Sequence, residues 1–298
     1  MGVQGRKRKR FASGDYVASV DPVGEEADHK SLRDVPLDRY DAVLACIPDE
    51  PKLELVRYCI ENGKHVLVEK PLWSPRDEDI SELECAARSR GVLVYTAYNH
   101  RFEPHFVRMR DLISSGELGA IYSCRMFYGN GTARLVRDSV WRDQDGGVIP
   151  DLGSHLLDTC RFWFGDISDD ARLISASRFE NRAPDHAIFI VDNRPRIELE
   201  MTLCMWRNHF TCDILAERGT AHIESLCKWG PTTFRHRRRV LPSGSPPETA
   251  VTLTQEDPTW ALEYEHFKKL CDARTPTDLS NDLTIQRTLR RLAKDATA

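Results

Sequence analysis

Strand-like and helix-like stretches alternate through the first third of the chain, and this alternation constrains the fold more than any other feature. The strand cores at 42–45 and 66–68 are continuously apolar, which is typical of strands covered on both faces. Helices between such strands predict parallel pairing and a doubly wound sheet. We expect strands at 16–21, 40–48, 65–69 and 92–97, and helices at 51–62 and 77–90.

The rest of the chain follows a different pattern. Alternating apolar residues and turn signals predict antiparallel strands in an open sheet with helices on one face. The stretch 242–247 has the composition of a surface loop. We expect helices near 104–115, 151–164, 258–271 and 282–293, and strands at 121–128, 187–191, 197–205 and 209–215.

Charge and cysteine usage narrow the class of protein. A formal net charge of -4 gives no overall basic field, so nucleic acid is a poor default partner. The nine cysteines form no C-x-x-C pair, which favours a reducing cytoplasm over a disulfide framework or a metal site. No apolar run approaches the roughly 20 residues of a membrane span, and the basic N-terminus lacks the apolar region of a secretory signal. We therefore expect a cytoplasmic protein with no membrane partner.

Two glycines near the N-terminus fit a known phosphate-binding pattern. Gly2 and Gly5 supply the last two glycines of G-x-G-x-x-G, whose first glycine would precede residue 1. Such glycines let backbone amides approach a pyrophosphate at a helix N-terminus, and an acid after the next strand binds the adenosine ribose. Asp21 has that position, and its charge favours NAD over NADP. The alternative is a turn before a short basic helix.

A missing strand and a run of basic residues are the two notable features near these glycines. The strand that precedes such a loop in a complete domain is missing, which we interpret as an internal start site, a fragment or a degraded domain. The basic run 6–10 either coats the solvent face of a helix, with some cations near a pyrophosphate, or forms a nucleic-acid or nuclear-localisation patch. A second basic run at 235–239 predicts a solvated strand or a strand edge.

Glu69, Lys70 and Pro71 stand at the carboxyl end of a buried strand. Ligands of open α/β sheets bind beyond such strand ends. A lysine there can hydrogen-bond a substrate hydroxyl, and its charge can stabilise a developing alkoxide. The alternative is a turn that carries a solvated lysine.

Asp151 and His155 follow a glycine-rich loop and lie four residues apart, on one face of the predicted helix. The carboxylate can orient the imidazole, and histidine is the natural general base for a hydroxyl proton near neutral pH. The alternative is a structural Asp–His contact. Asp158, one turn further along, is interpreted as a surface salt-bridge partner.

Taken in order and spacing, these motifs resemble the Gfo/Idh/MocA family, which includes glucose-fructose oxidoreductases and inositol dehydrogenases, over essentially the whole chain. The resemblance implies an α/β protein with an N-terminal Rossmann domain over 1–98, its first strand missing. It also implies a C-terminal α/β domain over 99–298 on an open, mainly antiparallel sheet that assembles homodimers or homotetramers. The motifs are the glycine remnant with Asp21, Glu69-Lys70-Pro71, Tyr98-Asn99-His100-Arg101-Phe102, and Gly146-Gly147 followed by Asp151, Gly153 and His155.

The resemblance also implies roles for individual residues. Lys70 would bind and polarise the reacting hydroxyl, His155 would be the general base or acid, and Asp151 would support it. Many relatives have a histidine where this chain has Lys52, and the segment between Asp21 and Tyr40 is short, so the adenine side of the pocket is expected to be altered. The cofactor-binding candidates are Gly2, Gly5, Arg6, Asp21, Pro48, Glu69 and Lys70. The substrate-binding candidates are Asn99, Arg101, Trp141 and Arg142.

Alternatives stay open for several of these residues and for the function. Asn99 and Arg101 are equally suited to capping and salt bridging, and for Trp141 a core position is the preferred interpretation. The expected function is hydride transfer between NAD, rather than NADP, and a hydroxyl or keto carbon of a sugar, inositol or sugar derivative. One alternative is a catalytically silent relative that binds a sugar or dinucleotide as a regulatory module, and another is a nucleic-acid-binding protein.

Overall fold

The computed structural model of the chain describes residues 1–12, 14–139, 142–167 and 171–297. They form two compact units, Met1–Asn99 with Thr259–Gln286, and His100–Pro258 with Arg287–Ala298. Residues 259–286, which the sequence analysis placed in the second domain, pack with the first unit, and the division falls within helix α8 (Ser280–Thr297). Among the described residues no helix is both long and apolar enough to cross a membrane.

The first unit is built on a three-stranded parallel sheet of order β1-β2-β3. Its strands are β1 (Ala42–Ala45), β2 (His65–Glu69) and β3 (Val94–Ala97). Successive side chains of a strand point to opposite faces, and both faces of β2 are buried: Val66 and Val68 lie in one core cluster and Leu67 in another. The prediction of parallel strands covered on both sides is confirmed.

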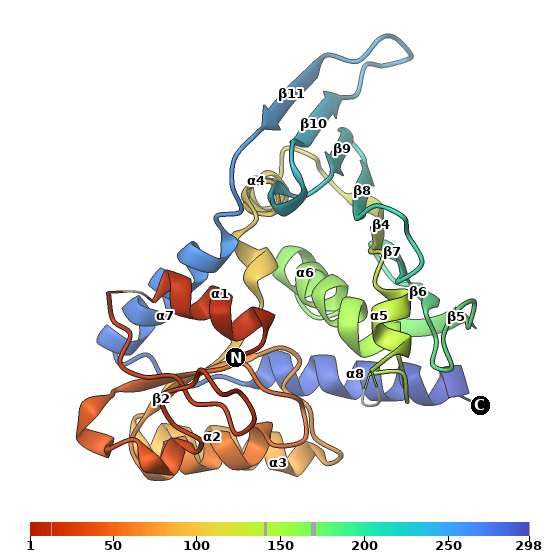
Figure 1. The fold of residues 1–298 in the computed structure, drawn as a ribbon. Helices are drawn as coiled ribbons and strands as arrows, with labels where there is room; N and C mark the ends of the chain where they lie inside the picture. The colour runs from red at the N-terminus through yellow and green to blue at the C-terminus, as the bar shows by residue number, and fades with distance from the viewer. Residues whose placement is uncertain (13, 140–141, 168–170, 298) are drawn as a thin grey trace. The chain divides into compact units, whose positions relative to one another are not determined.

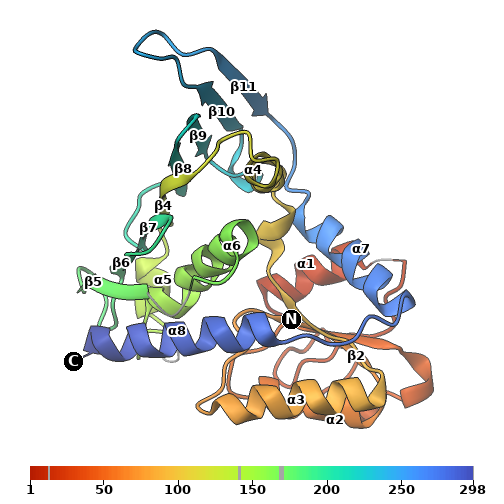
Figure 2. The ribbon, with the colours of Figure 1, turned by 180° about the vertical axis from the view of Figure 1, so that it is seen from behind.

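Helices cover both faces of this sheet (Figures 1 and 2). Helices α2 (Lys52–Glu61) and α3 (Asp77–Arg90) pack against the face that carries Val66 and Val68. Helix α7 (Thr259–Asp272) packs against the face that carries Leu67, and α1 (Val3–Phe11) lies beside α7. The layers are those of a doubly wound α/β domain.

The prediction of a strand at 16–21 is wrong, because that segment is a loop. Its pairing among the described residues is a single bridge between Val20 and His29. The Ser19 backbone N–H and hydroxyl both donate to Asp28 Oδ2, at 2.7 and 2.8 Å. Because a side-chain carboxylate satisfies the backbone here, it competes with a strand ladder.

The second unit carries an eight-stranded mixed sheet of order β11-β10-β9-β8-β4-β7-β6-β5. Strand β4 pairs in parallel with β7 and antiparallel with β8, and all other pairs are antiparallel. This confirms the open, mainly antiparallel sheet. The strands are β4 (Ile121–Gly129), β5 (Ala171–Ser177), β6 (His186–Val191), β7 (Arg196–Thr202), β8 (His209–Ala216), β9 (Gly219–Glu224), β10 (Thr232–Arg238) and β11 (Glu248–Leu253).

One face of this sheet is covered by helices α4 (Pro104–Ser114) and α6 (Ser154–Phe164). Phe106 of α4 packs against Phe210 of β8 with ring centroids 5.1 Å apart and planes inclined by 43°, and Trp163 of α6 donates its indole N–H to the Phe106 carbonyl at 3.0 Å. These aromatic contacts fix α6 on the sheet. The short helix α5 (Ala133–Arg137) follows β4.

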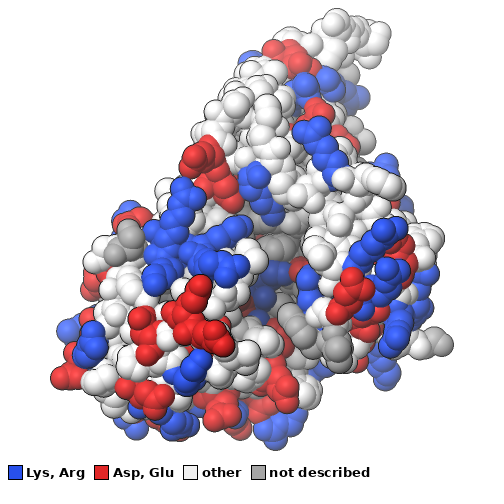
Figure 3. Space-filling view, in the orientation of Figure 1, with Lys and Arg blue, Asp and Glu red and all other residues white. Residues whose placement is uncertain are grey.

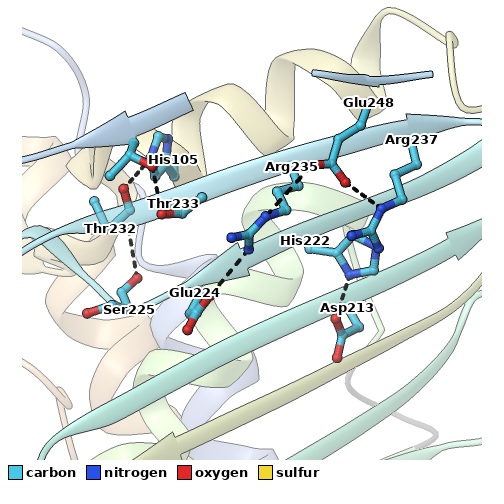
Figure 4. A network of polar contacts seen from close by, with 11 residues as sticks. His105, Asp213, His222, Glu224, Ser225, Thr232, Thr233, Arg235, Arg237 and Glu248 are labelled. Carbon is cyan, nitrogen blue, oxygen red and sulfur yellow. Dashed lines mark hydrogen bonds and ion pairs between the residues drawn. The ribbon is translucent and has the colours of Figure 1, made fainter. Parts of the chain in front are cut away.

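The second basic run lies largely on β10, so the predicted strand is present; of the two alternatives, a solvated strand or a strand edge, the edge does not apply. Strand β11 pairs with the outer side of β10 and forms the edge itself. Acids on the neighbouring strands neutralise the cations: Arg235 lies 3.2 Å from Glu224, and Arg237 donates to Glu248 at 2.6 Å (Figure 4). Cross-strand pairing therefore adds to solvent exposure in accommodating this charge.

Candidate active site

Glu69 ends β2, so Lys70 and Pro71 follow directly at the carboxyl end of a parallel strand, as predicted from the sequence. The Glu69 carboxylate accepts a hydrogen bond from Arg8 Nε at 2.9 Å and lies 2.8 Å from Nη2 of the same side chain. Arg8 Nη1 lies 2.7 Å from Glu263 Oε2 on α7. A buried cation therefore ties the end of β2 to the helix across this face of the sheet.

Arg8 is 3% exposed, so the expectation that the run 6–10 coats the solvent face of a helix is wrong for this residue. Its guanidinium also lies over the Trp260 ring, 4.3 Å from the centroid. Burial acts to lower the pKa of Arg8, but Glu263 and Glu69 outweigh burial and raise that pKa. The other four cations of the run are exposed, and Figure 3 shows basic side chains gathered where α1 lies in Figure 1.

Lys52 was named from the sequence only as a departure from relatives, yet it supports the Lys70–Pro71 turn. Its side chain is 2% exposed. Its ammonium donates to Asp49 Oδ1 at 2.6 Å and to the Pro71 carbonyl at 2.9 Å. Burial lowers the pKa of Lys52, and the Asp49 carboxylate opposes that effect. The spacing of three residues between Asp49 and Lys52 was the sequence signal that could have indicated this ion pair.

Asp21 lies beside the start of α1. Its Oδ1 accepts hydrogen bonds from the backbone N–H of Gly24 at 2.7 Å and of Val23 at 3.0 Å, and its Oδ2 lies 2.9 Å from the Met1 amino group. The Gly24 N–H, followed by the Met1 amino group and the Val23 N–H, lowers the pKa of Asp21 to about 2. An ionised carboxylate thus stands next to a helix that begins immediately after Gly2.

Two other cofactor-binding candidates lie near these elements. Arg6 donates from Nη1 to the Met1 carbonyl at 2.6 Å and is exposed. Pro48 is exposed in the loop that follows β1. The structure therefore brings Gly2, Arg6 and Asp21 together around the start of α1.

In the second unit, His155 lies in the first turn of α6. A π-turn (Ile149–Gly153) precedes this helix, so the α-helix expected from 151 begins at Ser154. Asp151 belongs to the π-turn, and its Oδ2 accepts a hydrogen bond from Arg142 Nη2 at 3.3 Å. A guanidinium therefore holds the carboxylate one turn before the histidine.

The glycine loop before this turn is closely packed. Gly147 has φ of +52°, and a Cβ at this position would lie 2.1 Å from the Pro184 carbonyl oxygen. The Val148 N–H also donates to the Pro184 carbonyl, at 2.8 Å. Only glycine fits this approach without displacing the backbone that leads into α6.

His100 and Tyr128 contact the His155 ring, and Lys228 and Trp229 contact these two residues in turn; we call the five residues the histidine cluster. The rings of His155 and His100 stack with centroids 4.0 Å apart and planes inclined by 19°. Tyr128, near the end of β4, lies 5.6 Å from the His100 ring and 6.1 Å from the His155 ring. Lys228 Nζ lies 3.3 Å from His100 Nε2 and donates to the Tyr128 hydroxyl at 2.9 Å, and Lys228 also lies over the neighbouring Trp229 ring.

Tyr128, Lys228 and Trp229 were not singled out from the sequence. They lie on β4 and on a 3₁₀ turn (Cys227–Trp229), far in sequence from the motif around His155. A lone Lys-Trp pair carries no spacing signal. The fold, not the local sequence, brings Tyr128 beside His155 and Lys228 beside His100.

The remaining substrate-binding candidates have partners in the structure. Arg101 forms a bidentate pair with Asp158, with Nη2 2.6 Å from Oδ1 and Nε 3.0 Å from Oδ2. Asp158 is 1% exposed, so its interpretation as a surface salt-bridge partner is wrong. Asn99 donates to the Thr259 hydroxyl at 2.8 Å. Trp141 lies outside the described residues.

Two family models match the chain. One is described as the oxidoreductase family with an NAD-binding Rossmann fold and matches residues 7–98. The other is described as the GFO/IDH/MocA C-terminal domain and matches residues 106–222. Together they span well over half of the chain. No cluster of potential metal ligands occurs among the described residues.

Curated relatives carry the names of sugar and polyol dehydrogenases. The scyllo-inositol 2-dehydrogenase (NADP(+)) IolW of Bacillus subtilis is 33% identical over 41% of this chain, and the match covers 34% of that protein. Inositol 2-dehydrogenase 3 of Saccharopolyspora erythraea is 25% identical over 71% of this chain and 60% of that protein. The chain thus matches between about one third and three fifths of the length of these relatives.

Solved structures share the fold. A levoglucosan dehydrogenase in complex with NADH superposes with a TM-score of 0.82 at 16% identity, and the match covers 99% of this chain and 95% of that one. At this identity the likeness concerns the fold alone. Both family models, the order of the motifs and the fold agree, and the chain therefore belongs to the Gfo/Idh/MocA family of oxidoreductases.

Proposed function

We propose that the chain is an NAD(P)-dependent oxidoreductase that transfers a hydride between nicotinamide and a hydroxyl or keto carbon of a sugar, inositol or sugar derivative. The observation that carries this proposal is the position of Lys70 directly after the parallel strand β2, where ligands of doubly wound sheets bind. The names of the relatives, which act on inositols, support the same substrate class.

The residues around the start of α1 fit a dinucleotide. A helix N-terminus after Gly2 offers backbone N–H groups to a pyrophosphate, and the Asp21 carboxylate beside it suits ribose hydroxyls. Since its pKa is about 2, Asp21 is ionised at neutral pH and would repel a 2′-phosphate. This favours NAD, although IolW is named as NADP-dependent. Gly2, Gly5, Arg6, Asp21, Pro48, Glu69 and Lys70 are the residues proposed to hold it.

When bound, nicotinamide supplies the hydride acceptor or donor. In our proposal the Lys70 ammonium donates a hydrogen bond to the reacting hydroxyl oxygen and stabilises the negative charge that develops there. His155 takes the hydroxyl proton during oxidation and returns it during reduction. Asp151, held by Arg142, supports His155 from the π-turn. Asn99, Arg101, Trp141 and Arg142 remain the proposed substrate contacts.

The test begins with fluorescence titration of the chain with NADH and NADPH, followed by a panel of inositols, aldoses and sugar acids. We expect tighter binding of NADH and turnover of at least one polyol. Lys70→Met and His155→Asn should each lower kcat by at least about 100-fold with NADH affinity kept within a few-fold. Lys294→Met, at an exposed lysine on α8, is the matched control.

The second candidate is a catalytically silent relative. The observation that favours it is the small size of the sheet in the first unit, to which the described residues supply three strands. NADH binding without turnover of any compound in the panel would support it. Near wild-type turnover of Lys70→Met or His155→Asn would instead refute the role of that residue.

We further propose that the chain forms a homodimer or homotetramer through the sheet of the second unit. On β8 the side chains Phe210, Cys212 and Ile214 are buried, whereas the alternate residue Leu215 is 50% exposed and Tyr122 of β4 is 48% exposed. Large exposed apolar side chains on a sheet face suit an interface between copies. Sedimentation at several concentrations tests this, and a monomer at every concentration would refute it.

We place the protein in the cytoplasm, since all nine cysteines are free thiols. Fractionation of cells that produce the full-length protein tests this location.

A further inference from the structure

Lys228 lies in the histidine cluster without belonging to any motif. It is carried by the 3₁₀ turn Cys227–Trp229, which is firmly anchored: Cys227 is 3% exposed, and its backbone N–H donates to Glu103 Oε1 at 3.2 Å. Glu103 is itself 2% exposed, and burial raises its pKa, while the Cys227 N–H and Lys228 oppose that effect. A lysine on an anchored turn keeps a defined direction for its side chain.

In the described part of the chain Lys228 makes two polar contacts, with a histidine ring nitrogen and with a tyrosine hydroxyl. Its ammonium lies 3.3 Å from His100 Nε2 and 2.9 Å from the Tyr128 hydroxyl oxygen. An ammonium group has three donors and no acceptor. His100 Nε2 must therefore accept, which places the proton of the neutral imidazole on Nδ1. The Tyr128 hydroxyl, which accepts from the same ammonium, keeps its own proton available for donation.

His100 in turn stacks on His155, with ring centroids 4.0 Å apart and ring planes inclined by 19°. A stacked ring restricts rotation of its partner about the side-chain torsions, because any large rotation breaks the contact. The edge contact between His100 and Phe106, at 5.8 Å and 86°, holds His100 from another side. The orientation of the His155 ring thus depends on His100, and that of His100 depends on Lys228.

We propose that Lys228 is a positioning residue, which fixes the Nδ1-protonated tautomer of His100 and, through the stacked rings, the orientation of His155. Lys228 acts through His100 and does not itself exchange a proton with the substrate. The kinetic consequence rests on the proposed function of His155, but the tautomer of His100 does not.

The first test is therefore spectroscopic. Nitrogen NMR of the imidazole side chains, assigned with a His100→Gln variant, identifies which nitrogen of His100 carries the proton. We expect Nδ1–H in the wild type and in Lys228→Arg, since the guanidinium also donates. Lys228→Met keeps most of the side-chain volume but removes the donor, so we expect a change toward the other tautomer. A protonated Nε2 in the wild type, or an unchanged tautomer in Lys228→Met, would overturn the proposal.

The second test is kinetic. A displaced general base slows the chemical step, so Lys228→Met should lower kcat by about 10- to 100-fold with KM changed less than about 3-fold. Lys228→Arg should restore most of kcat, and the exposed Lys294→Met should match the wild type. A rise in KM alone would assign Lys228 to substrate binding and refute the positioning role. If the chain turns over no polyol, the NMR result still decides the tautomer, so the two proposals fail separately.

Discussion

Removing the Arg8 side-chain charge should destabilise the first unit in a pH-dependent way. Arg8 is 3% exposed and bridges Glu69, whose side chain is 16% exposed, and Glu263, which is 0% exposed. In Arg8→Met the Glu69 carboxylate keeps part of its hydration. Glu263 has no access to water, so its carboxyl group is expected to bind a proton in the folded state instead of remaining charged.

The cost follows from the pKa of a carboxyl group in the unfolded chain. Proton uptake costs about 1.4 kcal/mol for each pH unit above a glutamate pKa of about 4.3. Arg8→Met should therefore lose about 4 kcal/mol at about pH 7 and about 2 kcal/mol at about pH 5.5. Because the buried carboxyl group of the variant takes up a proton that the unfolded chain does not bind at neutral pH, the loss relative to the wild type is smallest at low pH and grows as pH rises.

Urea unfolding followed by far-UV circular dichroism at both pH values measures these differences. Arg10→Met, an exposed position on the same helix, is the matched control and should change stability by less than about 0.5 kcal/mol. Adding Glu263→Gln to Arg8→Met should remove most of the pH dependence, because an amide does not titrate. A loss that is equal at the two pH values, or no larger than that of Arg10→Met, would refute the reasoning.

Two further predictions concern the second unit and the cysteines. Gly147→Ala should cost more than about 2 kcal/mol in thermal or urea unfolding, because its Cβ would meet the Pro184 carbonyl at 2.1 Å. Gly116→Ala, with a similar positive φ but open space, should cost only about 1 kcal/mol, and equal costs would contradict the packing argument. Thiol labelling of the native chain at mild alkaline pH should modify Cys85 first, since it is the exposed cysteine among the nine. A Cys85→Ser variant should lose this fast phase, and its persistence would show that another thiol is accessible.

Much of the fold was predictable from the sequence, because the apolar patterns that indicate helices and strands belong to residues that are buried in the folded protein. Strand β2 and helix α3 begin and end where the sequence predicts, at 65–69 and 77–90. The segment 16–21 was predicted as a strand from its apolar residues, but Asp28 competes for the Ser19 backbone donor. That competition depends on a residue outside the segment, so local pattern alone did not reveal it.

In the candidate site, too, some features follow from local sequence and others depend on contacts between residues far apart in the chain. The positions of Lys70 after β2 and of His155 in the first turn of α6 follow from local sequence. The contacts of Arg8 with Glu263 and of Lys228 with His100 join residues far apart in the chain. A basic run gives no indication that one of its members is buried, because the run reports composition and not the direction of each side chain on the helix.

The place of β4 in its sheet has a consequence for the order in which the chain acquires structure. This strand lies between β7, its parallel partner, and β8, and both follow it only after residues 130–195. Closing so long a segment is entropically costly and slows folding. During synthesis β4 leaves the ribosome well before either partner, with both of its edges unpaired. A chaperone that binds extended apolar segments would therefore find a target at Ile121–Gly129, and substitutions at the exposed positions of this strand should reduce the yield of folded protein more than its final stability.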